Sequence, residues 1–335
     1  MAEVRKSSLE GHLFADDLVL PFRTERSGVT GRLVRLGPVV DSILGRHAYP
    51  EPVSRILGEA VALTTLLGSS LKFDSALVGR LILQTKTDGP LRLLVVDFEE
   101  PGHIRAYASF DQARIEGLAQ AANVTAGDIL GSGHLAMTID PGGNLDRYQG
   151  IVPLAGGSIA DAAHAYFRQS EQIPTFIRLA VARQYSASRG GHGSWQWRAG
   201  GLLIQYVPPI EEGAISDDGT MAEHVLVGEE DDRWTRTRML AATVEDHELL
   251  DPTLSPERLL YRLFNEEGVR AHRTLPIQER CRCSRHRVDN LLASFGPSEL
   301  ADMREPDGAI TVTCEFCNTH YRFEAGEMVG SAPAS

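Results

Sequence analysis

Residues 81–98, which read LILQTKTDGPLRLLVVDF, decide the fold class of the larger part of this chain. The segments 81–87 and 91–98 are strand-like, and Asp88-Gly89-Pro90 between them is a turn sequence. Two strands joined by so short a turn run antiparallel, because a parallel pair needs a long crossover. The stretch therefore predicts a β-hairpin within an antiparallel sheet, and it argues against a doubly wound parallel sheet.

The flanking sequence extends this hairpin into an α+β domain. Residues 33–36, 103–109, 134–140 and 201–207 read as further strands, and Ser158 is a candidate N-cap for a helix that runs toward Pro174. A long helix opened by Pro52 should bury one stripe of apolar residues at helical spacing. The stripe consists of Val53, Ile56, Leu57, Ala60, Val61, Leu67 and Leu71. We predict an antiparallel-sheet domain with packed helices over residues 1–210.

Residues 211–276 read as an acidic and helical linker. Thirteen acidic residues against three arginines in 211–251 account for ten of the twelve net negative charges of the chain, which is typical of a solvated face. Residues 234–247 and the segment opened by Ser255-Pro256 predict amphipathic helices without a large core of their own, so they should lie on the first domain or on a partner. Their candidate apolar surface consists of Trp234, Leu259, Leu260, Leu263 and Phe264.

The four cysteines of the chain stand in two close pairs, Cys281 with Cys283 and Cys314 with Cys317. Such spacing supplies a tetrahedral thiolate set and predicts one zinc ion with no open position for catalysis. The surrounding segment, residues 277–328, has few large apolar side chains, so bound metal should supply the missing stability. Residues 329–335 are a tail.

A structural zinc ribbon and a redox-sensitive one both fit these cysteines. Sulfurs around one zinc ion lie roughly 3.8 Å apart, and sequence neighbours can close to a disulfide with little backbone movement. Oxidation would release the ion and remove a folding contribution on the order of 10 kcal/mol. We expect Arg280, Arg282 and Arg285 to favour the reactive thiolate form. His286 and His320 are expected at the surface or behind the ligands.

The composition excludes several classes of function. The apolar stretches are strand-sized and interrupted, and four cysteines are too few for a disulfide scaffold, so we expect a soluble cytoplasmic protein without a membrane partner. A net charge of -12 makes nucleic acid an unfavourable partner. The glycines at 131 and 133 precede a strand-like run where a dinucleotide motif needs a helix. We therefore expect no catalytic site.

The same residues resemble the 33 kDa chaperonin family, the bacterial redox-regulated heat-shock holdases. The resemblance runs from roughly residue 15 to residue 328. It is carried by the cysteine pairs with their neighbours, by Tyr321 and Phe323, and by the run from Tyr166 to Thr175. The stretch from Gly58-Glu59-Ala60 to Lys72-Phe73 resembles the long helix of the family.

The resemblance implies an ATP-independent chaperone that is inactive while reduced and zinc-bound. It implies that Cys281 pairs with Cys283 and Cys314 with Cys317 under oxidative stress, that zinc leaves, and that the linker unfolds. The exposed apolar surface then binds unfolding client proteins. The oxidised protein is implied to be a homodimer that later passes its clients to foldase chaperones.

Two other classes stay open on the sequence alone. One is a constitutive interaction module whose zinc ribbon presents a surface to a protein or RNA partner. The other is an enzyme with an active site in the first domain, which would work without the cysteine-containing segment. Oxidation should bring about a gain of function in a redox-regulated holdase, but not in a constitutive interaction module or in such an enzyme.

Overall fold

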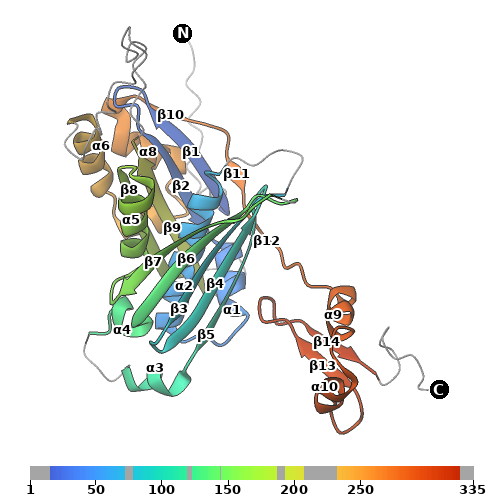
Figure 1. Cartoon of the computed structure of the whole chain (residues 1–335). Coiled ribbons are helices and arrows are strands. Elements are labelled where there is room, and N and C mark those ends of the chain that lie inside the picture. Colours follow the sequence, from blue (N-terminus) through green and yellow to red (C-terminus); the bar gives the residue numbers. More distant parts are fainter. Residues whose placement is uncertain are drawn as a thin grey trace, which may run out of the picture.

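The computed structural model describes residues 16–71, 78–118, 123–143, 145–186, 193–206 and 232–324. Four parts of the predictions lie outside these residues: positions 72–73 of the family-like helix stretch, Val207 of the predicted last strand of the first domain, positions 211–231 of the acidic segment, and the tail at 329–335. Within them the chain forms two large sheets, helices around and between the sheets, and a small C-terminal module (Figure 1).

The predicted hairpin is present as β3 (Arg80–Thr87) and β4 (Leu91–Glu99), which lie side by side inside the first sheet. In the described chain this sheet has the strand order β12-β5-β4-β3-β6-β7. All of its pairs are antiparallel except the short parallel pair of β12 with β5. The remaining strands are β5 (His103–Phe110), β6 (Ser132–Asp140), β7 (Tyr148–Ala155) and β12 (Gln278–Glu279).

The second sheet has the order β10-β1-β2-β9-β8, and β11 also pairs with β1. Each of these pairs is antiparallel, as predicted for the first domain. Two short strands of this sheet come from the end of the predicted linker. The strands are β1 (Leu18–Thr24), β2 (Thr30–Leu36), β8 (Thr175–Ser186), β9 (Ser194–Gln205), β10 (Val269–Ala271) and β11 (Leu275–Pro276).

Helix α2 (Glu51–Gly68) lies between the two sheets and contacts strands of both. The predicted stripe is buried from Val53 to Leu67, whereas Leu71 lies beyond the end of the helix and is partly buried. Burial extends around most of the helix because a sheet covers each side. Gly68 shows how close the packing is, since an added Cβ would stand 2.4 Å from the ring of Phe98. The other helices of this region are α1 (Pro38–Gly45), α3 (Gln112–Leu118), α4 (Ala126–Leu130) and α5 (Ile159–Tyr166), and a π-helical turn, Phe167–Glu171, continues α5.

Three helices cover the outer face of the β10-β1-β2-β9-β8 sheet: α6 (Asp232–Ala242), α7 (Asp246–Leu250) and α8 (Pro256–Phe264). A 3-10 turn, Asn265–Glu267, follows α8. The prediction of one helix over 234–247 is wrong, because the helix is interrupted at 243–245. A new helix, α7, then begins, and Glu248 Oε2 caps it by accepting from the backbone N–H of Glu245 at 3.0 Å. The predicted cap of α8 is present, since Ser255 Oγ accepts from the N–H of Arg258 at 3.2 Å. These helices pack on the first domain, as expected for segments without a core of their own.

The C-terminal module, drawn in orange to red in Figure 1, contains α9 (Arg285–Leu292), α10 (Pro297–Asp302), and the hairpin of β13 (Ile310–Thr313) and β14 (His320–Phe323). Its buried cluster contains only Val288, Leu292, Ile310 and Phe323 among the described residues. So small a core favours the expectation that something other than apolar burial holds the module together.

None of the described helices combines the length and the hydropathy needed to cross a bilayer.

Candidate metal centre and its docking face

Two loops of the C-terminal module bring the four cysteines together. Cys281 and Cys283 lie between β12 and α9, while Cys314 and Cys317 lie in the turn that joins β13 to β14. This turn is closed by backbone hydrogen bonds, from Cys314 N to Thr319 O at 2.9 Å and from Asn318 N to Cys314 O at 2.7 Å. Asn318 adopts a φ of 57°, a left-handed conformation that asparagine tolerates well.

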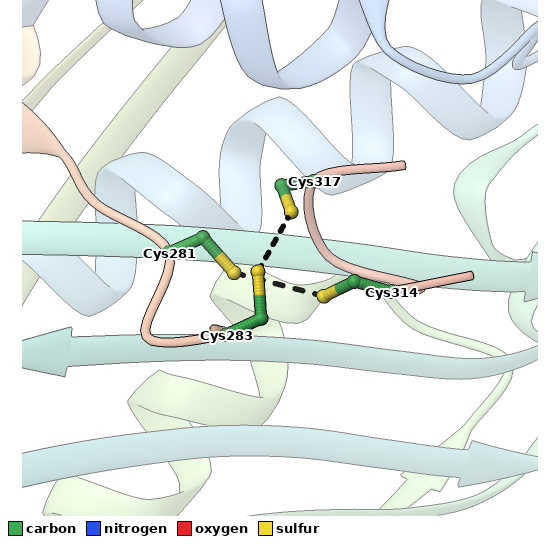
Figure 2. A group of neighbouring side chains, drawn as sticks. All are labelled: Cys281, Cys283, Cys314 and Cys317. Carbon is green, nitrogen blue, oxygen red and sulfur yellow. Dashed lines mark hydrogen bonds between the residues drawn. The ribbon is translucent and has the colours of Figure 1, made fainter. Parts of the chain in front are cut away.

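All four Sγ atoms lie within 4.8 Å of one another, and the side chains point toward a common centre (Figure 2). The Sγ atoms of Cys281 and Cys314 are 3.7 Å apart, and those of Cys283 and Cys317 are 3.2 Å apart. A tetrahedral zinc–thiolate site has sulfur–sulfur separations of roughly 3.8 Å. The cysteines are unpaired and half-buried, so their donor set and spacing fit a metal ion of this kind.

The surroundings of the sulfurs favour thiolate at one position and thiol at another. Burial raises the pKa of Cys283 to about 12, although the hydroxyl of Tyr321 donates to its Sγ at 3.1 Å. Burial also acts to raise the pKa of Cys317, but hydrogen bonds with Thr319 and with Cys283 outweigh it and lower that pKa to about 6. The cluster therefore holds at least one sulfur ready to act as an anionic ligand or as a nucleophile.

The two nearby histidines are not part of the cluster, as the sequence predicts. His320 Nδ1 lies 2.8 Å from the hydroxyl of Thr313, and His286 Nε2 lies 3.3 Å from Nδ2 of Asn290. Both histidines are exposed. The cysteines are the ligand set that the described residues offer.

Two of the three arginines beside the first cysteine pair, Arg282 and Arg285, lie differently from the expectation that they favour the thiolate form. Arg282 reaches away from the sulfurs and forms ion pairs with Asp97 and Glu99 of the neighbouring sheet. The guanidinium of Arg285 lies 4.4 Å from the centre of the Phe323 ring. The neighbouring sheet instead brings Arg105 of β5 close to a thiol. Its hydrogen bonds to Asp97, with a smaller contribution from nearby Cys281, raise the pKa of Arg105 against the effect of burial.

Arg282 and Arg105 share a single carboxylate. Arg105 donates to Asp97 Oδ2 from Nε at 3.0 Å and from Nη2 at 2.8 Å, and Arg282 Nη2 donates to the same oxygen. The Asp97 side chain is 5% exposed. Ion pairs at such a site are screened little by solvent, so this contact fixes the C-terminal module on the sheet.

A second group of contacts fixes the turn that carries Cys314 and Cys317. The ring of Phe316 lies 4.0 Å below the guanidinium of Arg105 and 6.4 Å from the ring of Tyr107. In the loop after α1, His47 Nε2 lies 2.8 Å from the carbonyl oxygen of Glu315, and Arg46 Nη1 donates to Cys317 O at 3.3 Å. The part of the chain that precedes the linker is called the first region. Its residues that contact the C-terminal module in these two groups form the docking face: Arg46, His47, Asp97, Glu99, Arg105 and Tyr107.

No local signal in the sequence points to the docking face. Its residues come from β4, β5 and the loop after α1, and they meet the module only because β12 pairs with β5. The residues Asp97 and Arg105 face each other across the β4–β5 ladder, which a sequence can show only if the pairing register is already known.

The apolar residues singled out in the linker are all buried on the second sheet. Trp234 of α6 and four residues of α8 pack with side chains of β1, β2 and β9. The rings of Phe22 and Phe264 stack with centroids 5.4 Å apart. The exposed fractions of the five are 2%, 0%, 1%, 3% and 0% for Trp234, Leu259, Leu260, Leu263 and Phe264.

Comparisons with known proteins agree with this architecture. The model of the Hsp33 protein family matches residues 17–324. A 33 kDa chaperonin of Caulobacter vibrioides is 44% identical over 310 residues, which is 92% of this chain and 95% of the relative. One from Methylobacillus flagellatus is 36% identical over 303 residues, or 90% of each protein.

A solved structure supports the fold. The crystal structure of the 33 kDa chaperonin (heat shock protein 33 homolog) from Thermotoga maritima superposes with a TM-score of 0.67 and 23% identity. The match covers 93% of this chain and 96% of that one. With the whole-chain match of the family model and relatives of this similarity, this chain belongs to the Hsp33 family, whose members are chaperones and not enzymes.

Proposed function

We propose that this chain is a redox-regulated, ATP-independent holdase that is inactive while its four cysteines are reduced and hold one zinc ion. The observation that carries the proposal is the convergence of four unpaired sulfurs in a module with a very small apolar core. The proposed ligands are Cys281, Cys283, Cys314 and Cys317. Bound zinc would supply a cross-link with a folding contribution on the order of 10 kcal/mol, which apolar burial in this module cannot match.

Oxidation removes the ligand set. In each proposed pair, Cys281 with Cys283 and Cys314 with Cys317, two thiolates lose one electron each and one S–S bond forms. The two electrons, together with two protons from solvent, reduce one hydrogen peroxide to two water molecules. Disulfide sulfurs are neutral and bind metal weakly, so two such reactions leave the module without its cross-link.

Loss of the module's fold has a direct route to the rest of the chain. Phe316 and Arg282 are held at the docking face only while the cysteine loops keep their shape. The segment that joins the linker to the module is held by three contacts. Its strand β11 pairs with β1, its strand β12 pairs with β5, and Ile277 between these two strands is buried. Unfolding of the module thus loosens the segment that anchors the end of the linker.

Release of the linker would uncover the apolar face of the second sheet and the apolar sides of α6 and α8. The proposed client-binding surface includes Trp234, Leu259, Leu260, Leu263 and Phe264, which are buried in the resting state. Contiguous exposed apolar surface is what a holdase needs to bind unfolding proteins. Resting burial and active binding are therefore compatible roles for the same side chains.

The proposal divides the chain into a core chaperone domain at 1–210, a linker at 211–276, a redox domain at 277–328 and a tail at 329–335. It places the protein in the cytoplasm, where thiols are reduced at rest. It makes the oxidised form a homodimer that keeps clients soluble until foldase chaperones take them over.

One experiment tests the proposal as a whole. Purified protein is assayed for bound zinc, free thiols and suppression of thermal aggregation of an unrelated enzyme, before and after peroxide at mildly raised temperature. We expect about one zinc per chain at rest. Peroxide should release that zinc, consume all four thiols and bring about suppression. Protein kept with a thiol reductant at the same temperature is the control. Zinc release without gain of suppression would overturn the proposal.

A further inference from the structure

Arg35 of β2 is a charged residue buried inside the apolar contact between the second sheet and the linker. Its side chain lies among the leucines of that contact and the residue has an exposed fraction of 0%. Burial lowers the pKa of Arg35 to about 10, so the guanidinium still carries its charge at neutral pH. A buried charge requires hydrogen-bond partners, and the identity of these partners is informative.

Among the described residues, the side-chain hydrogen bonds of Arg35 all go to backbone carbonyls of the linker. Nε donates to Leu249 O at 3.3 Å, Nη2 donates to Glu248 O at 3.2 Å, and Nη1 donates to Leu254 O. Among the described residues no carboxylate oxygen accepts a hydrogen bond from this side chain. Arg35 therefore binds the carboxyl-terminal end of α7, where a helix leaves its last carbonyls without partners.

Two residues of β9 complete the same site. Arg198 Nε donates to Leu250 O at 2.7 Å, and its two Nη atoms bind Asp16 at 2.8 and 2.6 Å. Gly200 lies opposite Arg35 in the β2–β9 ladder, and an added Cβ there would stand 2.6 Å from Leu249 O. The absence of a side chain at 200 makes room for the carbonyl. We call Arg35, Arg198 and Gly200 the carbonyl cradle.

Departure of the linker would affect the two arginines unequally. Arg198 would keep both hydrogen bonds to Asp16, whereas Arg35 would lose every partner that it has among the described residues. The uncovered surface would then be an apolar sheet with one cation that lacks a hydrogen-bonded counter-ion. Such a surface fits an amphipathic segment that ends in backbone acceptors, which is what α7 offers at rest.

We propose that the carbonyl cradle is a client-binding subsite that recognises the carboxyl-terminal end of amphipathic helices in unfolding proteins, and that α7 is its resting occupant. The inference rests on the proposed function, because the cradle is accessible only when the linker leaves. It adds a chemical preference to apolar binding: a helix end that carries a carboxylate, the strongest acceptor for the Arg35 guanidinium, is held more tightly than a neutral helix end.

The test uses two fluorescent amphipathic helical peptides of Leu, Ala, Glu and Lys, identical except that one ends in a carboxylate and the other in a carboxamide. Binding to the oxidised full-length protein is measured by anisotropy. We expect the carboxylate peptide to bind about tenfold more tightly, as for a charge-assisted hydrogen bond. In Arg35→Met the two affinities should agree within about twofold.

The matched control is Arg32→Met. Arg32 lies on the same strand but pairs with Leu203, which faces the cluster between the two sheets and not the linker. The difference in affinity between the two peptides should persist in this variant. Gly200→Ala fills the cradle without changing its charge, so it should also reduce the difference in affinity between the two peptides. It serves as the test variant if Arg35→Met does not fold. Oxidised wild type that suppresses aggregation but binds both peptides equally overturns the inference alone. Oxidised wild type that neither binds a peptide nor suppresses aggregation overturns the proposed function as well.

Discussion

Helices α2 and α9 both present apolar residues to a sheet, but they are held in very different ways. Helix α2 has a sheet on each side and belongs to a buried cluster that draws side chains from both sheets and from α1, α4 and α5. Helix α9 contributes Val288 and Leu292 to a cluster whose only other buried members in the described chain are Ile310 and Phe323. We therefore expect the first region to fold by burial alone and, on the proposed function, the C-terminal module to depend on metal held by its sulfurs.

This difference shows how one chain can have a stable part and a conditional part. Removing one side chain from the large cluster leaves many contacts in place. In the module, the cysteines join the β12–α9 loop to the β13–β14 turn, and few other described contacts do so. On the proposed function, a chemical change confined to sulfur would therefore unfold one region and spare the other.

The largest expected effect comes from Cys283→Ser. Loss of one ligand should abolish stoichiometric zinc binding and unfold the module, with a loss on the order of 10 kcal/mol of metal-linked stability. Zinc analysis and limited proteolysis between residues 280 and 324 measure both effects. Leu291→Ser, at a residue of α9 that is 54% exposed, is the control and should bind one zinc. Full metal affinity in Cys283→Ser would mean that the ligand assignment is wrong.

A smaller effect is expected for Leu57→Ala in α2. Leu57 is fully buried in the large cluster, and such truncations cost about 2–5 kcal/mol. The melting temperature of the first region should fall, while zinc content and peroxide-driven zinc release stay as in the wild type. Exposed Leu145→Ala serves as the reference. Loss of zinc in Leu57→Ala would show that the two regions do not fold by separate means.

The contact between the regions is tested by Arg282→Met. Removing this guanidinium leaves Asp97 with Arg105 alone and should weaken docking by about 1.5–3 kcal/mol, the range for hydrogen bonds to charged groups. We expect the module to keep its zinc but to release it severalfold faster under peroxide, as followed with a chromogenic chelator. Arg304→Met, which removes an exposed arginine elsewhere in the module, should release zinc at the wild-type rate. If Arg282→Met released zinc at the wild-type rate under peroxide, the docking face would have no role in the response to oxidation.

The smallest effect concerns a carboxyl group within the first region. Glu59 of α2 lines a cavity of about 440 Å³ between α2 and α4, and burial raises its pKa from 4.5 to about 7. Between these values the folded state binds more protons than the unfolded state, so the contribution of Glu59 to stability is present below pH 4.5 and is lost as the pH rises to about 7.

Glu59→Gln should therefore gain about 1–3 kcal/mol relative to the wild type between pH 5 and pH 8, as measured by chemical unfolding of the first region. Exposed Glu116→Gln is the control and should show no such change. A stability difference between Glu59→Gln and the wild type that does not vary with pH would contradict the assigned pKa.

The sequence was most informative where a short signal acts locally. The turn at 88–90 predicts the β3–β4 hairpin, Ser158 and Ser255 predict the starts of α5 and α8, and the cysteine spacing predicts the cluster. It was least informative where distant segments meet. The pairing of Arg282 with Asp97 and of Arg35 with the end of α7 depends on sheet register and on linker packing, which periodicity does not encode. The break at 243–245 was missed because helical spacing continues across it.

The short strand β12 ends at Glu279, two residues before Cys281, and it pairs with β5 in the sheet that bears the docking face. After reduction, the sulfur ligands are thus tethered close to the surface on which they must settle. Their return is an intramolecular search with a high effective concentration, and its rate should not depend on how much protein is present. Redocking of the module within each chain would then be set by the chemistry of reduction and by metal supply, and not by an encounter between two chains.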